Sequence, residues 1–325
     1  MKILKLFIVL IFTVPILSGC YDYKEPNDIA YIVAVGIDKA ENENVYNYSL
    51  QYVRPTQITG GASQEGGKTE DTSDIISIEA PSVYSALNVG NHVLSKTLTL
   101  SHTKLIVVSD ELAKEGIGEI IESMGRNSDI RPNVYFCVSK GEAGKYLKEV
   151  KPTIEINPTK YYRLIFENNT SSYIPVGDSQ KVYLNYKNKT KQNIIPYVGT
   201  AKKESSSSDS EKGGEEEKKS EQSGEEESEE KTQKENNLSV PINDMGFEHN
   251  MKEYIAGNMD IERKNKSEAM GACVFRNDKM IATLNGIESE IYNILNGTYK
   301  VGYSVISSKN SPNNPVTIRL EQLNN

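Results

Sequence analysis

The sequence has few of the residues that build common catalytic or metal sites. Its 325 residues include no tryptophan, three histidines and three cysteines. His92, His102 and His249 do not have the spacing of a metal-binding helix or turn. Neither a Gly-x-Ser-x-Gly elbow nor a Gly-x-Gly-x-x-Gly fingerprint occurs. We therefore predict a protein that is not an enzyme and that holds no metal and no cofactor.

Two of the cysteines lie in short apolar runs. Cys137 falls within residues 133–139 and Cys273 within residues 271–275. An exported chain with so few thiols is not built on a disulfide framework. We expect two buried free thiols, with a single bridge between them as the alternative.

The third cysteine closes a lipoprotein signal. Lys2 and Lys5 precede an apolar run from residue 6 to residue 17, and Leu17-Ser18-Gly19-Cys20 follows. The run is too short for a permanent transmembrane helix, and the small residues fit a signal peptidase. We predict a signal peptide over residues 1–19, lipidation of Cys20 and a tether over residues 20–28. A buried signal anchor with an incidental cysteine is the alternative.

Most of the acidity comes from one low-complexity segment. Residues 201–237 contain 13 acidic and 7 basic residues and no aromatic residue. Such a segment buries too little apolar surface to offset its ordering entropy, so we predict a disordered acidic insertion at about 201–265. A solvated insertion is favoured over a regulatory or partner-binding arm. No clustered basic face is present, and we expect no nucleic-acid partner.

Hydrophobic periodicity predicts alternating strands and helices. Strands are expected at 29–38, 45–53, 74–79, 103–109, 134–139, 194–200, 271–275, 279–284, 299–307 and 315–320. Helices are expected at 81–94, 110–125 with a break, 141–150, 160–168, 180–185 and 288–296. Strand 45–53 alternates bulky and polar residues, so we expect it to be half-buried.

This alternation predicts an α+β or mixed α/β fold in two unequal domains, each with a mixed sheet packed by helices. The first would be an N-terminal α/β domain over residues 29–190. The second would be a smaller α+β domain over residues 191–325, interrupted by the acidic insertion.

Several short motifs in this order resemble one family of proteins. They are Cys20-Tyr21-Asp22, Val35-Gly36-Ile37-Asp38, Ser101-His102-Thr103-Lys104-Leu105-Ile106-Val107, Asp110-Glu111-Leu112-Ala113, Asp129-Ile130-Arg131-Pro132-Asn133, Gly271-Ala272-Cys273-Val274-Phe275 and Leu284-Asn285-Gly286. With the lipobox, they resemble the Ger(x)C family, the lipoprotein C subunits of bacterial spore germinant receptors. The similarity extends over nearly all of the chain after Cys20 apart from the acidic segment.

The resemblance implies a subunit needed for nutrient-triggered spore germination, anchored by Cys20 to the outer face of the spore inner membrane. Its partners would be the A-type and B-type integral membrane subunits, and no catalytic residues are implied. For His102, Arg131 and Asn133 we favour a structural role, with contact to partner subunits as the sharper alternative. An extracytoplasmic solute-binding lipoprotein of a transporter is the competing function.

The sequence departs from the family pattern in three respects. Tyr21 replaces a favoured tryptophan, Pro26 replaces an apolar residue, and the acidic segment is long. The family also implies a third, C-terminal α/β domain, which we expect to be missing from this chain.

Overall fold

The computed structural model describes most of the chain between residues 28 and 321. The described residues are 28–53, 73–155, 157–167, 172–188, 191–201, 254–258, 265–308 and 311–321, with 3–5, 7 and 25 near the N-terminus. Cys20 and most of the acidic segment lie outside them.

The strands lie close to their predicted positions. They are β1 (Ile29–Lys39), β2 (Tyr46–Val53), β3 (Ser73–Ala80), β4 (Thr97–Thr99), β5 (Leu105–Ser109), β6 (Tyr135–Ser139), β7 (Ile194–Thr200), β8 (Ser267–Arg276), β9 (Lys279–Leu284), β10 (Val301–Ser308) and β11 (Ser311–Glu321). Only the three-residue β4 had no counterpart in the sequence prediction.

The helices are equally close to prediction. They are α3 (Val83–Val93), α4 (Asp110–Glu115), α5 (Gly118–Gly125), α6 (Ala143–Glu149), α7 (Pro158–Phe166), α8 (Ser179–Lys187) and α9 (Gly286–Leu295). The predicted break between α4 and α5 falls at Gly116, whose φ of 131° is not helical.

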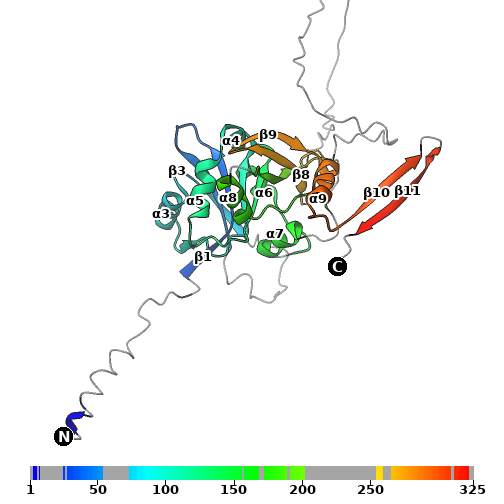
Figure 1. The fold of residues 1–325 in the computed structure, drawn as a ribbon. Coiled ribbons are helices and arrows are strands. Elements are labelled where there is room, and N and C mark those ends of the chain that lie inside the picture. Colours follow the sequence, from blue (N-terminus) through cyan, green and yellow to red (C-terminus); the bar gives the residue numbers. More distant parts are fainter. Residues whose placement is uncertain are drawn as a thin grey trace, which may run out of the picture.

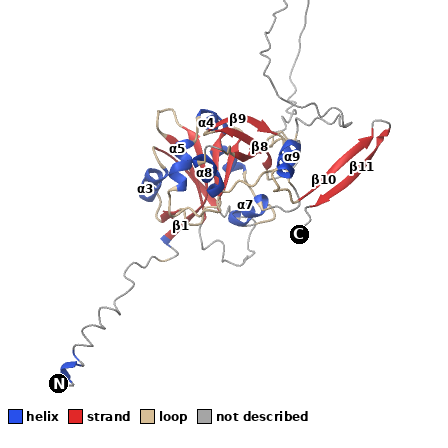
Figure 2. Cartoon of the chain, viewed as in Figure 1, coloured by secondary structure: helices blue, strands red, loops and turns tan. Residues whose placement is uncertain are grey.

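Nine strands form one mixed sheet, in the order β3-β2-β1-β5-β6-β7-β8-β9, with β4 paired to the start of β1. Strands β1, β5, β6 and β7 are parallel, and antiparallel pairs extend the sheet at both ends. Helices cover the sheet, as Figure 2 shows. The predicted α+β class is confirmed.

Strands predicted for two domains share this sheet. Strand β7 pairs with β6 through Val138 and Tyr197, and with β8 through Ile194 and Val274. Among the described strands, β10 and β11 alone form a separate sheet, a hairpin that stands out from the body in Figure 1. The structure thus differs from two domains with a sheet each, because the free edge of β7 accepts β8. A division at residue 190 stays a prediction.

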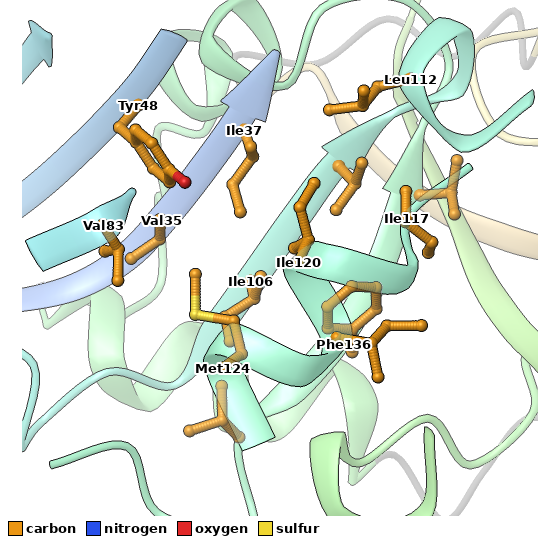
Figure 3. Packing of buried hydrophobic residues seen from close by; sticks show 14 of the residues in the cluster. Val35, Ile37, Tyr48, Val83, Ile106, Leu112, Ile117, Ile120, Met124 and Phe136 are labelled. Atoms are coloured by element: carbon orange, nitrogen blue, oxygen red, sulfur yellow. The ribbon is translucent and has the colours of Figure 1, made fainter. Parts of the chain in front are cut away.

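The larger core lies between the sheet and helices α3, α4, α5 and α8. Val35 and Ile37 of β1 and Ile106 of β5 face Ile120 and Met124 of α5 (Figure 3). All five side chains are buried. Because β5 is buried on both faces, its run Leu-Ile-Val-Val is continuously apolar, as is typical of a central parallel strand.

Helices α6 and α7 cover the other face, and they change the environment of β2. Ser49 and Gln51 were expected on the solvated side, but both are 2% exposed. The hydroxyl group of Tyr162 on α7 donates to Gln51 Oε1 at 2.6 Å, and Ser49 Oγ lies 3.1 Å from Ser77 Oγ. The prediction that β2 is half-buried is wrong, because two helices pack over its polar side chains.

A short segment within the predicted insertion packs onto the sheet. Ala256 is fully buried, and its N–H donates to the carbonyl group of Met270 at 3.0 Å. The N–H of Gly257 donates to the buried carboxylate of Glu268 at 2.6 Å. Within the predicted insertion, Ala256 thus belongs to the core and Ile255 packs against it, while the bounds of the insertion stay a prediction.

Substituting Gly199→Ala is expected to destabilise this packing. A Cβ atom at position 199 would lie 2.9 Å from Gly257 N and 3.0 Å from Ala256 C, both of them backbone atoms. We expect the free energy of unfolding in urea to fall by about 1–3 kcal/mol, the usual cost of overpacking. The adjacent substitution Thr200→Ala, which adds no atoms, should change it by less than about 0.5 kcal/mol. Equal stability of both variants would show that residues 254–258 move aside for the added Cβ atom at little cost in free energy.

Cys137 and Cys273 are both buried and free. The prediction of two buried thiols is confirmed, and no bridge joins them. Burial raises the pKa of each thiol well above its usual value, so both stay protonated and unreactive at neutral pH.

Candidate functional site

The first candidate site lies at the carboxyl ends of the parallel strands, which we call the carboxyl edge. A cavity of about 590 Å³ opens there. It is lined by Asp38, Lys39, Asn47, Ser109, Asp110, Glu111, Lys140, Gly141, Glu142, Lys145, Tyr146 and Thr200. Open α/β sheets commonly bind ligands at this edge, where helices leave for opposite faces. Here α4 leaves β5 for one face and α6 leaves β6 for the other.

Asp38 is the most buried carboxylate of this cavity, with 8% of its surface exposed. Its two oxygens accept the N–H groups of Ala143 at 2.6 Å and Gly144 at 2.8 Å, at the start of α6. Burial raises the pKa of Asp38, the two N–H donors partly offset this, and Glu142 adds to the increase. Asp38 lies at the end of the strand predicted over residues 29–38, and its position alone predicts no role for it.

Gly36 makes this arrangement possible by letting α6 approach β1. A Cβ atom at position 36 would lie 3.2 Å from the backbone carbon of Ala143 and 3.1 Å from the side chain of Leu147. The motif Val35-Gly36-Ile37-Asp38 is therefore explained by packing: its glycine admits the helix and its aspartate caps it.

Several other charged groups of the cavity are paired. Asp110 accepts the N–H of Gly141 at 3.1 Å and pairs with Lys114 at 2.8 Å. Lys39 pairs with Glu115, and Lys140 donates to Asn258 at 2.5 Å. The cavity walls are thus held together by polar contacts between elements far apart in the sequence.

The chemistry available at this edge is limited. Residues 141–145 look superficially like a phosphate loop, but the first N–H groups of α6 donate to the Asp38 carboxylate, which occupies the place of an anion. Among the described residues, no group of three or more histidine, cysteine or acidic side chains could hold a metal ion. What remains is a polar hollow with charges of both signs.

The second candidate site is the amino edge, the opposite end of the same strands. We use this name for the start of β1 and the loops 100–104 and 126–134. The N–H of Lys104 donates to the carbonyl group of Val33, and the N–H of Tyr135 donates to that of Lys104, both at 2.9 Å. These bonds hold the two loops against β1.

The structure brings His102 and Arg131 together at this edge. The ring of His102 packs edge-on against Tyr31 at a centroid distance of 4.5 Å, and its Nδ1 lies 3.0 Å from Ser101 Oγ. Burial lowers the pKa of His102, and the positive charges of Arg131 and Lys104 lower it further. The side chains of His102, Arg131 and Asn133 are nonetheless exposed.

Hydrogen bonds fix the backbone of the 131–133 loop. The carbonyl group of Arg131 accepts the N–H of Val134 at 3.2 Å. The carbonyl group of Pro132 accepts the N–H of Gln180 and the hydroxyl group of Ser179. The loop thus joins the start of β6 to the start of α8, and its side chains remain available for contacts.

Helix α9 shows an inverted distribution of polar and apolar residues. Its buried face carries Ser289, Glu290 and Asn293, and the amide of Asn293 donates to the carbonyl groups of residues 172 and 174. Its exposed face carries Ile294 and Leu295, at 47% and 82% exposure. Nothing in the described part of the chain covers that apolar face.

None of the described helices has both the length and the apolar character needed to cross a bilayer.

Comparison with protein families identifies the class of this fold. The family described as "Spore germination protein N-terminal domain" matches residues 22–200, more than half of the chain. The family described as "Spore germination B3/ GerAC like, C-terminal" matches residues 270–325. The chain belongs to the Ger(x)C family of spore germination proteins, and the resemblance seen in its motifs is confirmed.

Individual relatives are similar over parts of their length. Spore germination protein KC of Bacillus subtilis is 31% identical over 157 residues, which are 48% of this chain and 38% of that protein. Putative spore germination protein YfkR of the same organism is 30% identical over 39% of this chain and 33% of its own length. Spore germination protein B3 is 24% identical over 53% and 44%. The chain therefore spans less than half the length of these relatives.

A solved structure titled "Crystal Structure of the GerBC protein" also resembles this chain. The TM-score is 0.38 at 13% sequence identity, over 89% of this chain and 62% of that one.

Proposed function

We propose that this protein is the membrane-anchored C-type subunit of a nutrient germinant receptor, required for nutrient-triggered spore germination. The observation that carries the proposal is the family match over residues 22–200, directly after a lipobox that ends in Cys20. The subunit acts through protein–protein contacts and not through catalysis. It is held by lipid on Cys20 at the outer face of the spore inner membrane.

Its partners in this proposal are the A-type and B-type integral membrane subunits. His102, Arg131 and Asn133 are the proposed contact residues. Their support is positional, because their exposed side chains share one edge of the sheet while the backbone beneath them is fixed by hydrogen bonds.

The competing function, a solute-binding lipoprotein, gains little support from the fold. Such proteins enclose the ligand between two similar lobes, whereas the described strands β1 to β9 form one sheet. The carboxyl-edge cavity is the one feature that favours it. A thermal-shift screen with amino acids, sugars and nucleosides tests this function, because a ligand that binds the native state raises the melting temperature.

The proposed function is tested by complementation. Spores that lack the native gene are complemented with this chain, and the nutrient-triggered germination rate is measured beside an immunoblot of the membrane fraction. We expect restored germination with nutrient and no change in germination induced by an agent that bypasses nutrient receptors. Failure to restore the nutrient response, despite normal membrane-bound protein, would contradict the proposal.

A further inference from the structure

We infer that the amino edge of the sheet faces the bilayer, and that Lys104 and Arg131 contact the phosphate groups of its lipids. The inference rests on the proposed function, because it takes Cys20 as the lipid-bearing residue. It adds an orientation: one defined side of the body is held against the membrane, and the carboxyl-edge cavity points away from it.

The first support is the reach of the tether. Strand β1 begins at Ile29, nine residues after Cys20. Nine residues span at most about 30 Å when fully extended. Since β1 runs from the amino edge toward the carboxyl edge, its first residue enters the body at the amino edge. Any other side of the body can reach the bilayer only if the chain folds back along the sheet.

The second support is the charge at this edge. Lys104 and the exposed Arg131 form no ion pair within the part of the chain that the structure describes. Of the acidic groups nearby, Asp178 is engaged as the cap of α8, accepting the N–H of Lys181 at 2.7 Å, and Glu167 interacts with Tyr135. Asp28 and Asp129 are exposed. An ammonium and a guanidinium group without partners suit phosphate, which guanidinium binds in bidentate geometry.

The third support is the charge at the opposite edge. The carboxyl-edge cavity contains Asp38, Asp110, Glu111 and Glu142 against three lysines. The acidic segment starts just after β7 ends at Thr200, and the chain returns at residues 254–258, where Lys140 bonds Asn258. The described residues on either side of residues 202–253 therefore lie at the carboxyl edge. Repulsion from an anionic bilayer disfavours that edge, so charge and tether select the same orientation.

The absence of tryptophan from the chain provides a direct test. Single tryptophans are introduced as Asn133→Trp at the amino edge and Glu142→Trp at the carboxyl edge, both at exposed positions. Each full chain is bound to phosphatidylcholine vesicles containing phosphatidylglycerol. Attachment is through Cys20, either by the lipid that it carries or by coupling its thiol to a maleimide lipid. Cys137 and Cys273 are fully buried and do not compete for coupling.

Headgroup-labelled nitroxide lipids then quench whichever tryptophan lies near the bilayer. We expect strong quenching of the tryptophan at position 133 and little or no quenching of the tryptophan at position 142. Adding Lys104→Glu and Arg131→Glu to the Asn133→Trp chain should reduce its quenching on these vesicles. Equal quenching at both positions, stronger quenching at 142, or no effect of charge reversal would overturn the inference.

The outcome is separable from the proposed function. Mass spectrometry of the chain purified from its membrane reports whether Cys20 carries lipid, and the germination assay reports the receptor role. Because the maleimide lipid attaches the chain in either case, the orientation is measured even where those two assays fail.

Discussion

Replacing Cys20 with alanine is expected to release the protein from the membrane and to abolish nutrient-triggered germination. Each methylene of an acyl chain that enters the bilayer contributes about 0.8 kcal/mol, and two chains on one residue make attachment stable. Fractionation of spores with an immunoblot measures the first effect, and the rate of nutrient-triggered germination measures the second.

Cys137→Ala is the matched control, because it also removes a thiol. Cys137 is fully buried between the sheet and α6 and α7, so its loss creates a small cavity and leaves the anchor intact. That variant should stay in the membrane fraction. A Cys20→Ala protein that remains there and supports germination would refute the lipid anchor.

The positions of strands and helices were predictable because local periodicity determines them. Strand β1 reads as a β-branched run and α9 ends before a glycine, and both lie within two residues of prediction. The elements that pack over each strand could not be predicted from local periodicity. The polar residues of β2 are buried because α7, more than a hundred residues later, supplies Tyr162 to Gln51. No local pattern contains that information.

Of the two candidate sites, the amino edge could be predicted in part and the role of Asp38 at the carboxyl edge could not. His102 and Arg131 meet because Leu105 and Tyr135 are in register on adjacent parallel strands, and each site residue precedes its strand by three or four positions. If β5 and β6 are assumed to be parallel neighbours, the sequence predicts that His102 and Arg131 lie close together. The role of Asp38 could not be predicted, because its partners lie 105 and 106 residues further along the chain.

Asp38→Ala is expected to cause the largest loss of stability among the carboxyl-edge substitutions. Without the carboxylate, the N–H groups of Ala143 and Gly144 lose their acceptors inside the body. Leaving buried donors unpaired costs about 1–3 kcal/mol each, so the free energy of unfolding should fall by about 2–6 kcal/mol. Asp38→Asn should cost less, since its carbonyl oxygen still accepts one N–H while its NH₂ group opposes the other. Urea unfolding of the three proteins measures both effects.

The stability difference between wild type and Asp38→Ala should depend on pH. Because burial raises the pKa of Asp38 above its value of 3.8 in an unfolded chain, the folded state binds this proton more tightly than the unfolded chain does. The part of its contribution that is linked to proton binding is then fully present below 3.8 and is lost as the pH rises through the folded pKa, while the two N–H bonds to the carboxylate remain. The stability difference between wild type and Asp38→Ala should therefore be largest in acid and shrink toward neutral pH. Glu142→Ala, at an exposed neighbour, is the control: it removes a like charge from beside Asp38 and should leave stability at neutral pH unchanged or slightly higher. A stability difference that grows toward neutral pH would mean that the two N–H donors outweigh burial and that Asp38 favours its charged form.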